Sequence, residues 1–174
     1  MLHTSDNVNI DELIAFGKDM VRRVGAQALE LYGKGDPRMK FDEGLVTKAE
    51  LRLGDFFRRE LQSAFPEHAL FGDALPKEDY VHGGKGYLWV FDPLDGVANF
   101  QAGIPIWGTS VALLENFWPI FGVFFMPVTG DLLYARVGGQ AFWNDDPVQV
   151  PQSEGINNES LLLTYSRFHS RYRS

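Results

Sequence analysis

The spacing of apolar residues changes once along this chain, and the change limits the folds that the chain can adopt. From Ile10 to Leu31, apolar side chains recur every three or four residues and stop before Gly33. This period places them on one face of an amphipathic helix. Asn9, followed three residues later by Glu12, resembles a capping box at the start of that helix.

A second helix is expected between Thr47 and Phe65. Thr47 can cap its start, and Glu50 occupies the reciprocal position of a capping box. The apolar residues that follow lie mostly on one side of a helix, at Leu51, Leu53, Phe56, Phe57 and Leu61. Pro66 ends the helix because the residue before a proline is pushed out of helical geometry.

Beyond Pro66 the sequence turns to short runs of strand-forming residues. The runs cover residues 69–71, 87–91, 109–114, 119–126, 132–135 and 161–165. Linkers such as Glu115-Asn116, Thr129-Gly130 and Gly138-Gly139 are too short for parallel crossovers and favour antiparallel hairpins. We therefore expect an α+β fold in which two N-terminal helices are layered on a largely antiparallel sheet.

Composition excludes several classes of protein. The chain has no cysteine, which excludes disulfides and thiolate metal sites, and any metal must bind oxygen or imidazole. A formal net charge of −7 argues against broad nucleic-acid binding. The N-terminus lacks the pattern of a signal peptide, and the apolar run at 117–128 is shorter than the ~20 residues of a membrane helix. We expect a cytoplasmic protein with no nucleic-acid or membrane partner.

The residues with the clearest chemistry lie in the segment WVFDPLDGVANF, at 89–100. A hydrophobic strand leads into Asp92, Asp95 follows, and Gly96 opens what we expect to be a short helix. Two carboxylates this close repel each other unless a cation neutralises them, which favours a hard divalent ion. Amides at a helix start favour phosphate, and the combination is typical of a metal-assisted phosphatase. Asp-Pro and Asp-Gly are also common turn formers, and this alternative stays open.

Four stretches of the chain resemble the inositol monophosphatases, which belong to the Mg²⁺-dependent, lithium-sensitive phosphatases related to fructose-1,6-bisphosphatase. LVTKAE at 45–50 resembles the family's L-V-T-x-A-D, and FPEHALFGD at 65–73 resembles F-P-x-x-x-x-x-G-E-E. DPLDGVANF at 92–100 resembles D-P-I/L-D-G-T-x-N-F, and residues 130–144 resemble G-E-x-Y-x-A-x-x-G-x-G-A-F-x-N. The resemblance implies the N-terminal part of the layered sugar-phosphatase fold, a Mg²⁺ cofactor, a small phosphomonoester substrate (an inositol, sugar or nucleotide phosphate) and a homodimer.

The resemblance also implies metal ligands. Asp92 would bridge two metal ions, Asp95 would bind the second, and the Leu94 carbonyl would complete the first. Asp73 stands where the family has a glutamate that binds the first metal and orients the attacking water. These positions are the predicted metal site, with Asp73 also predicted as a catalytic residue.

Phosphate-binding and further catalytic positions follow from the same resemblance. Gly96 and Val97 would present backbone amides to the substrate phosphate beside Asp95. Glu50 stands where the family has an aspartate that supports the threonine here replaced by Val97, and it is predicted as catalytic. The alternative for Glu50 is a structural capping box with Thr47.

Several departures from the family pattern lead to rival hypotheses. Asp73-Ala74 replaces Glu-Glu, Val97 replaces threonine, and no W-D-x-A-G motif is present. We expect residues 1–174 to form an N-terminal α+β domain that binds metal and phosphate, with the family's C-terminal α/β domain absent. The rivals are a catalytically weakened homologue that keeps the fold and ligand binding, and a regulatory or interaction protein.

Histidines and aromatics offer no second site in the sequence. The four histidines lack metal-ligand spacing and are expected at the surface or in turns. A sheet core explains most of the aromatic cluster between Trp107 and Phe125, although its density also suits a dimer face.

Overall fold

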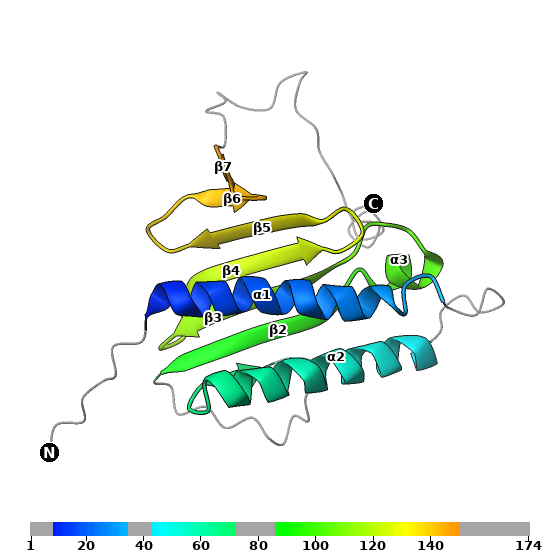
Figure 1. Cartoon of the computed structure of the whole chain (residues 1–174), viewed down its shortest axis with the longest axis horizontal. Coiled ribbons are helices and arrows are strands. Elements are labelled where there is room, and N and C mark those ends of the chain that lie inside the picture. Colours follow the sequence, from blue (N-terminus) through cyan, green and yellow to red (C-terminus); the bar gives the residue numbers. More distant parts are fainter. Residues whose placement is uncertain (1–8, 35–42, 72–85, 150–174) are drawn as a thin grey trace, which may run out of the picture.

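The computed structural model describes residues 9–34, 43–71 and 86–149 of the 174-residue chain. In this part of the chain, α1 (Ile10–Leu29) and α2 (Glu43–Ala64) lie side by side on one face of a β-sheet (Figure 1). The short helix α3 (Val97–Ala102) follows the second strand. The predicted α+β architecture, with two N-terminal helices layered on a sheet, is confirmed.

The described sheet has seven strands, which lie in the order of the sequence. β1 runs parallel to β2, and every other neighbouring pair is antiparallel, so the predicted hairpins are confirmed. The strands are β1 (Ala69–Phe71), β2 (Tyr87–Asp95), β3 (Gly108–Glu115), β4 (Trp118–Met126), β5 (Asp131–Arg136), β6 (Ala141–Trp143) and β7 (Asp146–Val148). The last two were not predicted, and the strand expected at 161–165 lies outside the described residues.

α1 starts where the sequence predicts, but the Asn9 side chain does not make the predicted capping-box bond with Glu12. Asn9 is the N-cap, and its side-chain oxygen accepts a hydrogen bond from the backbone N–H of Asp11 at 3.0 Å. The backbone N–H of Glu12 bonds the Asn9 carbonyl instead of its side chain. The helix ends at Leu29, before the last apolar residue of the pattern, and Leu31 packs against the core from the turn that follows.

The predicted start of α2 was wrong. The helix begins at Glu43, so Thr47 lies inside it and cannot be its N-cap. The buried stripe of the helix begins with Val46 and Ala49 and continues through Leu53 and Phe57, which places the first turn before Thr47. The capping-box alternative for Glu50 is therefore excluded.

Two glycines let α1 approach the sheet closely. A Cβ atom at Gly17 would lie 2.8 Å from the Phe121 ring, and one at Gly25 would lie 2.6 Å from Cγ of Pro127. Both distances are too short for real side chains, so only glycine fits at these positions. α1 therefore packs with its backbone almost against β4.

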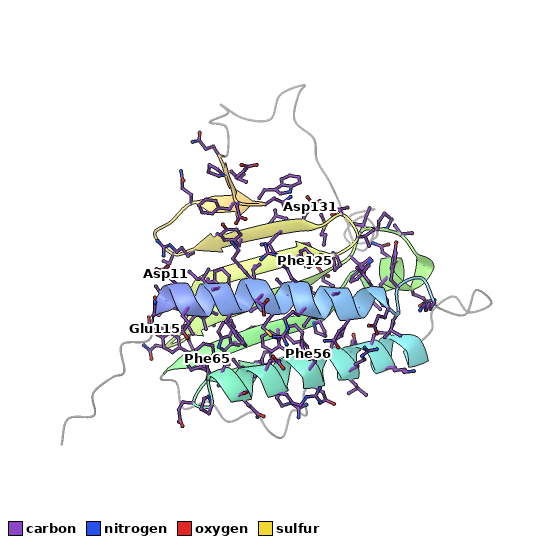
Figure 2. The ribbon with its side chains drawn as sticks, in the orientation of Figure 1. Asp11, Phe56, Phe65, Glu115, Phe125 and Asp131 are labelled. Atoms are coloured by element: carbon purple, nitrogen blue, oxygen red, sulfur yellow. The ribbon has the colours of Figure 1, made fainter. Side chains whose placement is uncertain are left out.

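The hydrophobic core lies between the two helices and the sheet face that they cover. Phe57 of α2 stacks on Phe91 of β2 with ring centroids 4.2 Å apart. Figure 2 shows Phe56 and Phe65 between α1 and α2, where Phe65 makes an edge-on contact with Phe16 at 5.2 Å. Such aromatic pairs stabilise a core beyond the area that they bury.

The opposite face of the sheet has a different character. Small or medium apolar residues pair in register across it, in the row Val90, Ala112, Gly122, Ala135, Ala141 and Val148. They line a groove of about 550 Å³, and Asp92 and Ser110 also line it. Within the described residues, no helix is both long and apolar enough to cross a membrane.

Candidate active site

The candidate site is built around an irregularity in β2. Asp92 pairs with Ser110 of β3, and Asp95 pairs with Gly108, so two residues of β2 face the single residue Thr109. An extra residue on one strand of an antiparallel pair is a β-bulge, which bends the strand and re-aims its side chains. Pro93 can occupy this position because the bulge requires no regular ladder bond from its nitrogen.

The bulge brings the two carboxylates to one face of the sheet. In a regular strand, side chains three residues apart point to opposite faces. Here the extra residue returns Asp95 to the face of Asp92. Their partners on β3, Ser110 and Gly108, are two residues apart and therefore lie on one face. Both aspartates are exposed, whereas Pro93 and Leu94 between them are buried.

Two side chains hold this turn. The Asp92 carboxylate accepts a hydrogen bond from the backbone N–H of Leu94 at 3.0 Å. The Thr109 hydroxyl donates to the Pro93 carbonyl, also at 3.0 Å. The turn-forming role considered for Asp92 is thus confirmed, and it is compatible with metal binding because a carboxylate has about four lone-pair sites. Thr109 was missed, since a single threonine in a predicted strand gives no signal.

Gly96 begins the next part of the site. It is the N-cap of α3 and has a left-handed conformation with φ +86°. A Cβ atom here would lie 2.9 Å from the Ile106 carbonyl oxygen and 3.1 Å from Cα of Trp107. Both the conformation and the close approach require glycine. Val97 is the first residue of α3, where backbone amides have no carbonyl partner within the helix.

The loop after α3 is tied to the helix. The Asn99 side-chain amide donates to the Ile106 carbonyl at 2.7 Å, and the N–H of Ile104 bonds the Asn99 carbonyl at 2.9 Å. The N–H of Gly33, in the turn after α1, donates to the Phe100 carbonyl at 3.0 Å. These bonds fix α3 and with it the backbone at Gly96.

The remaining predicted site residues, Asp73 and Glu50, are not part of this turn. Asp73 lies outside the described residues. The strand that precedes it, β1, runs parallel to β2, and its last residue, Phe71, pairs with Val90, two residues before Asp92. Glu50 is half-buried two turns into α2, a helix that contacts α3.

The predicted metal ligands consist of oxygen donors. The described residues contain no group of three or more His, Cys, Asp or Glu side chains that could hold a metal ion. The predicted donors Asp92, Asp95 and the Leu94 carbonyl are all oxygen atoms, which hard divalent cations prefer. The chemistry of this set fits Mg²⁺, with Asp73 as the further predicted carboxylate.

His68 has a packing role instead. It lies in the turn between α2 and β1, as predicted, and stacks on Phe65 with ring centroids 4.8 Å apart. Its Nδ1 accepts a hydrogen bond from Trp89 Nε1 at 3.0 Å. Burial lowers the pKa of His68 below its ordinary value of 6.5.

The aromatic cluster is divided between core and surface. Trp107 and Phe121 are buried, as a sheet core predicts. Phe117 and Trp118, at the hairpin between β3 and β4, are 50% and 78% exposed. The homodimer prediction stays a prediction.

Comparison with solved structures places the fold in a known class. An inositol monophosphatase of Thermotoga maritima matches with a TM-score of 0.70 and 25% identity, over 92% of this chain and 62% of that one. Inositol monophosphatase II of Staphylococcus aureus has the same fold, with a TM-score of 0.70 over 82% of this chain and 52% of that one. The described sheet and helices thus form part of the layered α+β fold of these phosphatases.

Sequence comparison gives the family. The profile of the inositol monophosphatase family matches residues 6–173, and the chain belongs to this family. It is 31% identical to a histidinol-phosphatase of Chlorobaculum parvum, over 86% of this chain and 58% of that protein. It is also 31% identical to an inositol-1-monophosphatase of Rhizobium meliloti, over 87% and 54% respectively. The chain therefore spans little more than half the length of these relatives.

Proposed function

We propose that this protein takes part in Mg²⁺-dependent hydrolysis of a small phosphomonoester. The observation that carries the proposal is the bulge in β2, which turns Asp92 and Asp95 to the same exposed face. Two exposed carboxylates on one face are suited to share a divalent cation, and neither carboxylate is buried in the hydrophobic core. The phosphatase relatives support the reaction class.

The metal would be held by Asp92, Asp95, the Leu94 carbonyl and Asp73. Support for Asp73 comes from the register of β1, because Phe71 and Val90 are paired and each stands two residues before a predicted ligand. When bound, Mg²⁺ supplies Lewis-acid stabilisation of the phosphoryl oxygens and lowers the pKa of a coordinated water. Asp73 would orient the attacking water.

The substrate phosphate would bind at the start of α3. The backbone amides of Gly96 and Val97 are the proposed donors, and the Ile106 carbonyl and Trp107 lie close against the left-handed turn at Gly96. Glu50, on the helix that contacts α3, is the proposed further catalytic residue. The threonine hydroxyl that the family has at position 97 is absent here.

We further propose that residues 1–174 act as the N-terminal metal- and phosphate-binding part of the fold. The relatives are longer, and their remaining length would correspond to a C-terminal α/β domain. A homodimer in the cytoplasm, and inositol, sugar or nucleotide phosphates as substrates, belong to the same proposal.

The test is phosphate release from a panel of inositol, sugar and nucleotide monophosphates, with and without Mg²⁺. We expect Mg²⁺-dependent turnover that Asp92→Asn abolishes, while Asp146→Asn, at an exposed carboxylate on β7, leaves it unchanged. No turnover at saturating Mg²⁺ would overturn the enzyme proposal. Large activity gained only by the triple variant Asp73→Glu, Ala74→Glu and Val97→Thr would identify a weakened homologue instead.

A further inference from the structure

We infer that Thr109 is a positioning residue for the metal ligands of β2. This inference rests on the proposed function, because it concerns how the same ligands are held. Thr109 is the residue of β3 that faces the bulge, and its side chain is 0% exposed. Its hydroxyl donates a 3.0 Å hydrogen bond to the Pro93 carbonyl.

The bulge explains why a hydroxyl is needed at this position. Where two residues face one, the regular ladder is interrupted and a backbone group is left without its cross-strand partner. Buried backbone carbonyls are almost always hydrogen-bonded, and Pro93 is buried. The Thr109 hydroxyl supplies a donor to the Pro93 carbonyl at the place where the ladder is interrupted.

The bond reaches the predicted ligands through one peptide group. The Pro93 carbonyl and the Leu94 N–H belong to the same planar unit. Thr109 holds this unit at its oxygen, and Asp92 holds it at its N–H through the 3.0 Å bond to the carboxylate. The orientation of this peptide plane fixes the position of the N–H that the Asp92 carboxylate binds. It also fixes the direction of the backbone at Leu94.

Removal of the hydroxyl should therefore weaken metal binding without altering any ligand. Thr109→Val keeps the shape of the side chain and removes the donor, so the peptide plane loses one of its two restraints. Residues that orient metal ligands change metal affinity by about 10–100-fold when substituted. We expect a loss in this range for Thr109→Val, and an affinity within about threefold of the unaltered chain for Thr109→Ser, which keeps the hydroxyl.

The experiment measures Mn²⁺ binding to the 174-residue chain by electron paramagnetic resonance, which needs no turnover. Val111→Ala serves as the matched control, since Val111 is buried on the same strand and the same face and donates no side-chain hydrogen bond. It should destabilise the fold and leave Mn²⁺ affinity within about threefold. Should Thr109→Val fail to fold, Thr109→Cys, with its weak S–H donor, should bind Mn²⁺ more weakly than Thr109→Ser.

The outcomes separate this inference from the proposed function. If the unaltered chain binds Mn²⁺ and Thr109→Val binds it equally well, the positioning role is overturned and the proposed function stands. If the Val variant is unfolded, equal Mn²⁺ affinities of Thr109→Cys and Thr109→Ser would likewise overturn the positioning role. If the unaltered chain does not bind Mn²⁺, the proposed metal site and this inference both fall.

Discussion

Trp89 Nε1 donates a hydrogen bond to His68 Nδ1 over 3.0 Å, and this bond ties β2 to the turn before the neighbouring strand β1. The acceptor nitrogen must be unprotonated, so the fold contains a neutral imidazole at position 68. Protonation of His68 would therefore break the bond that holds the turn before β1 to β2.

The fold should lose stability as the pH falls below about 6.5, the ordinary pKa of histidine. Burial lowers the pKa of His68, so the unfolded chain binds the proton more readily than the folded one. The stabilisation is complete above the unfolded pKa and is lost as the pH falls towards the folded pKa. Urea midpoints measured between about pH 8 and pH 5 should fall less steeply for His68→Asn than for the unaltered chain. If the urea midpoints of the two proteins fall equally with pH, the pH dependence belongs to groups other than His68.

Substitution of Gly25 by alanine should destabilise the fold by about 1–3 kcal/mol. The new methyl group would lie 2.6 Å from Cγ of Pro127 and 2.9 Å from the Phe125 ring. This clash should exceed the helix-propensity gain of up to ~1 kcal/mol that alanine brings. Gly122→Ala is the control, because a Cβ there meets no atom within 4 Å. Chemical denaturation measures both, and a stabilised Gly25→Ala variant would show that α1 can move away from the sheet.

Truncation of Phe57 to alanine should cost about 3–5 kcal/mol of unfolding free energy, as is usual for a buried phenylalanine. Its side chain is fully buried and stacks on Phe91, so the substitution leaves a cavity against β2. Leu51→Ala on the same helix should change stability by less than about 0.5 kcal/mol, because Leu51 is 53% exposed. Equal losses for the two variants would contradict the assignment of the core face of α2.

Mg²⁺ should raise the thermal midpoint of the unaltered chain and not that of Asp92→Asn. A ligand at about 100 times its dissociation constant stabilises a fold by about 2.7 kcal/mol if it binds only the native state. Asparagine keeps a side-chain oxygen that can accept the Leu94 N–H, so Asp92→Asn should change the midpoint in metal-free buffer less than the Mg²⁺-dependent shift. Calorimetry with Mg²⁺ and with a chelator measures the shift, and an equal shift in both proteins would place the metal elsewhere.

The helices and hairpins could be predicted because their signals are local. The period of apolar residues located α1, and two-residue linkers such as Thr129-Gly130 located the antiparallel turns. The start of α2 was missed because threonine is a good helix cap by type. In the structure the helix begins at Glu43, and the buried Val46 already belongs to its core face. Strands β6 and β7 were missed because they are mostly exposed, so no buried apolar run marks them, and β7 contains Pro147, a residue that disfavours strands.

The sequence could single out residues for the candidate site but not their geometry. Asp92 and Asp95 stand out by type and spacing, yet the face to which each points depends on the partner strand. Only the pairing with Ser110 and Gly108 shows that β2 contains an extra residue and that Thr109 faces it. Register of this kind is set by long-range contacts, so no local pattern could have revealed it.

The bulge in β2 also distinguishes two kinds of sequence change between its aspartates. Replacement of Leu94 by another apolar residue alters a side chain and keeps the number of residues between Asp92 and Asp95. Deletion or insertion of one residue there changes that number and would turn Asp95 to the helix-covered face of the sheet. The length of this short segment is therefore under a tighter structural constraint than the identity of the residues in it.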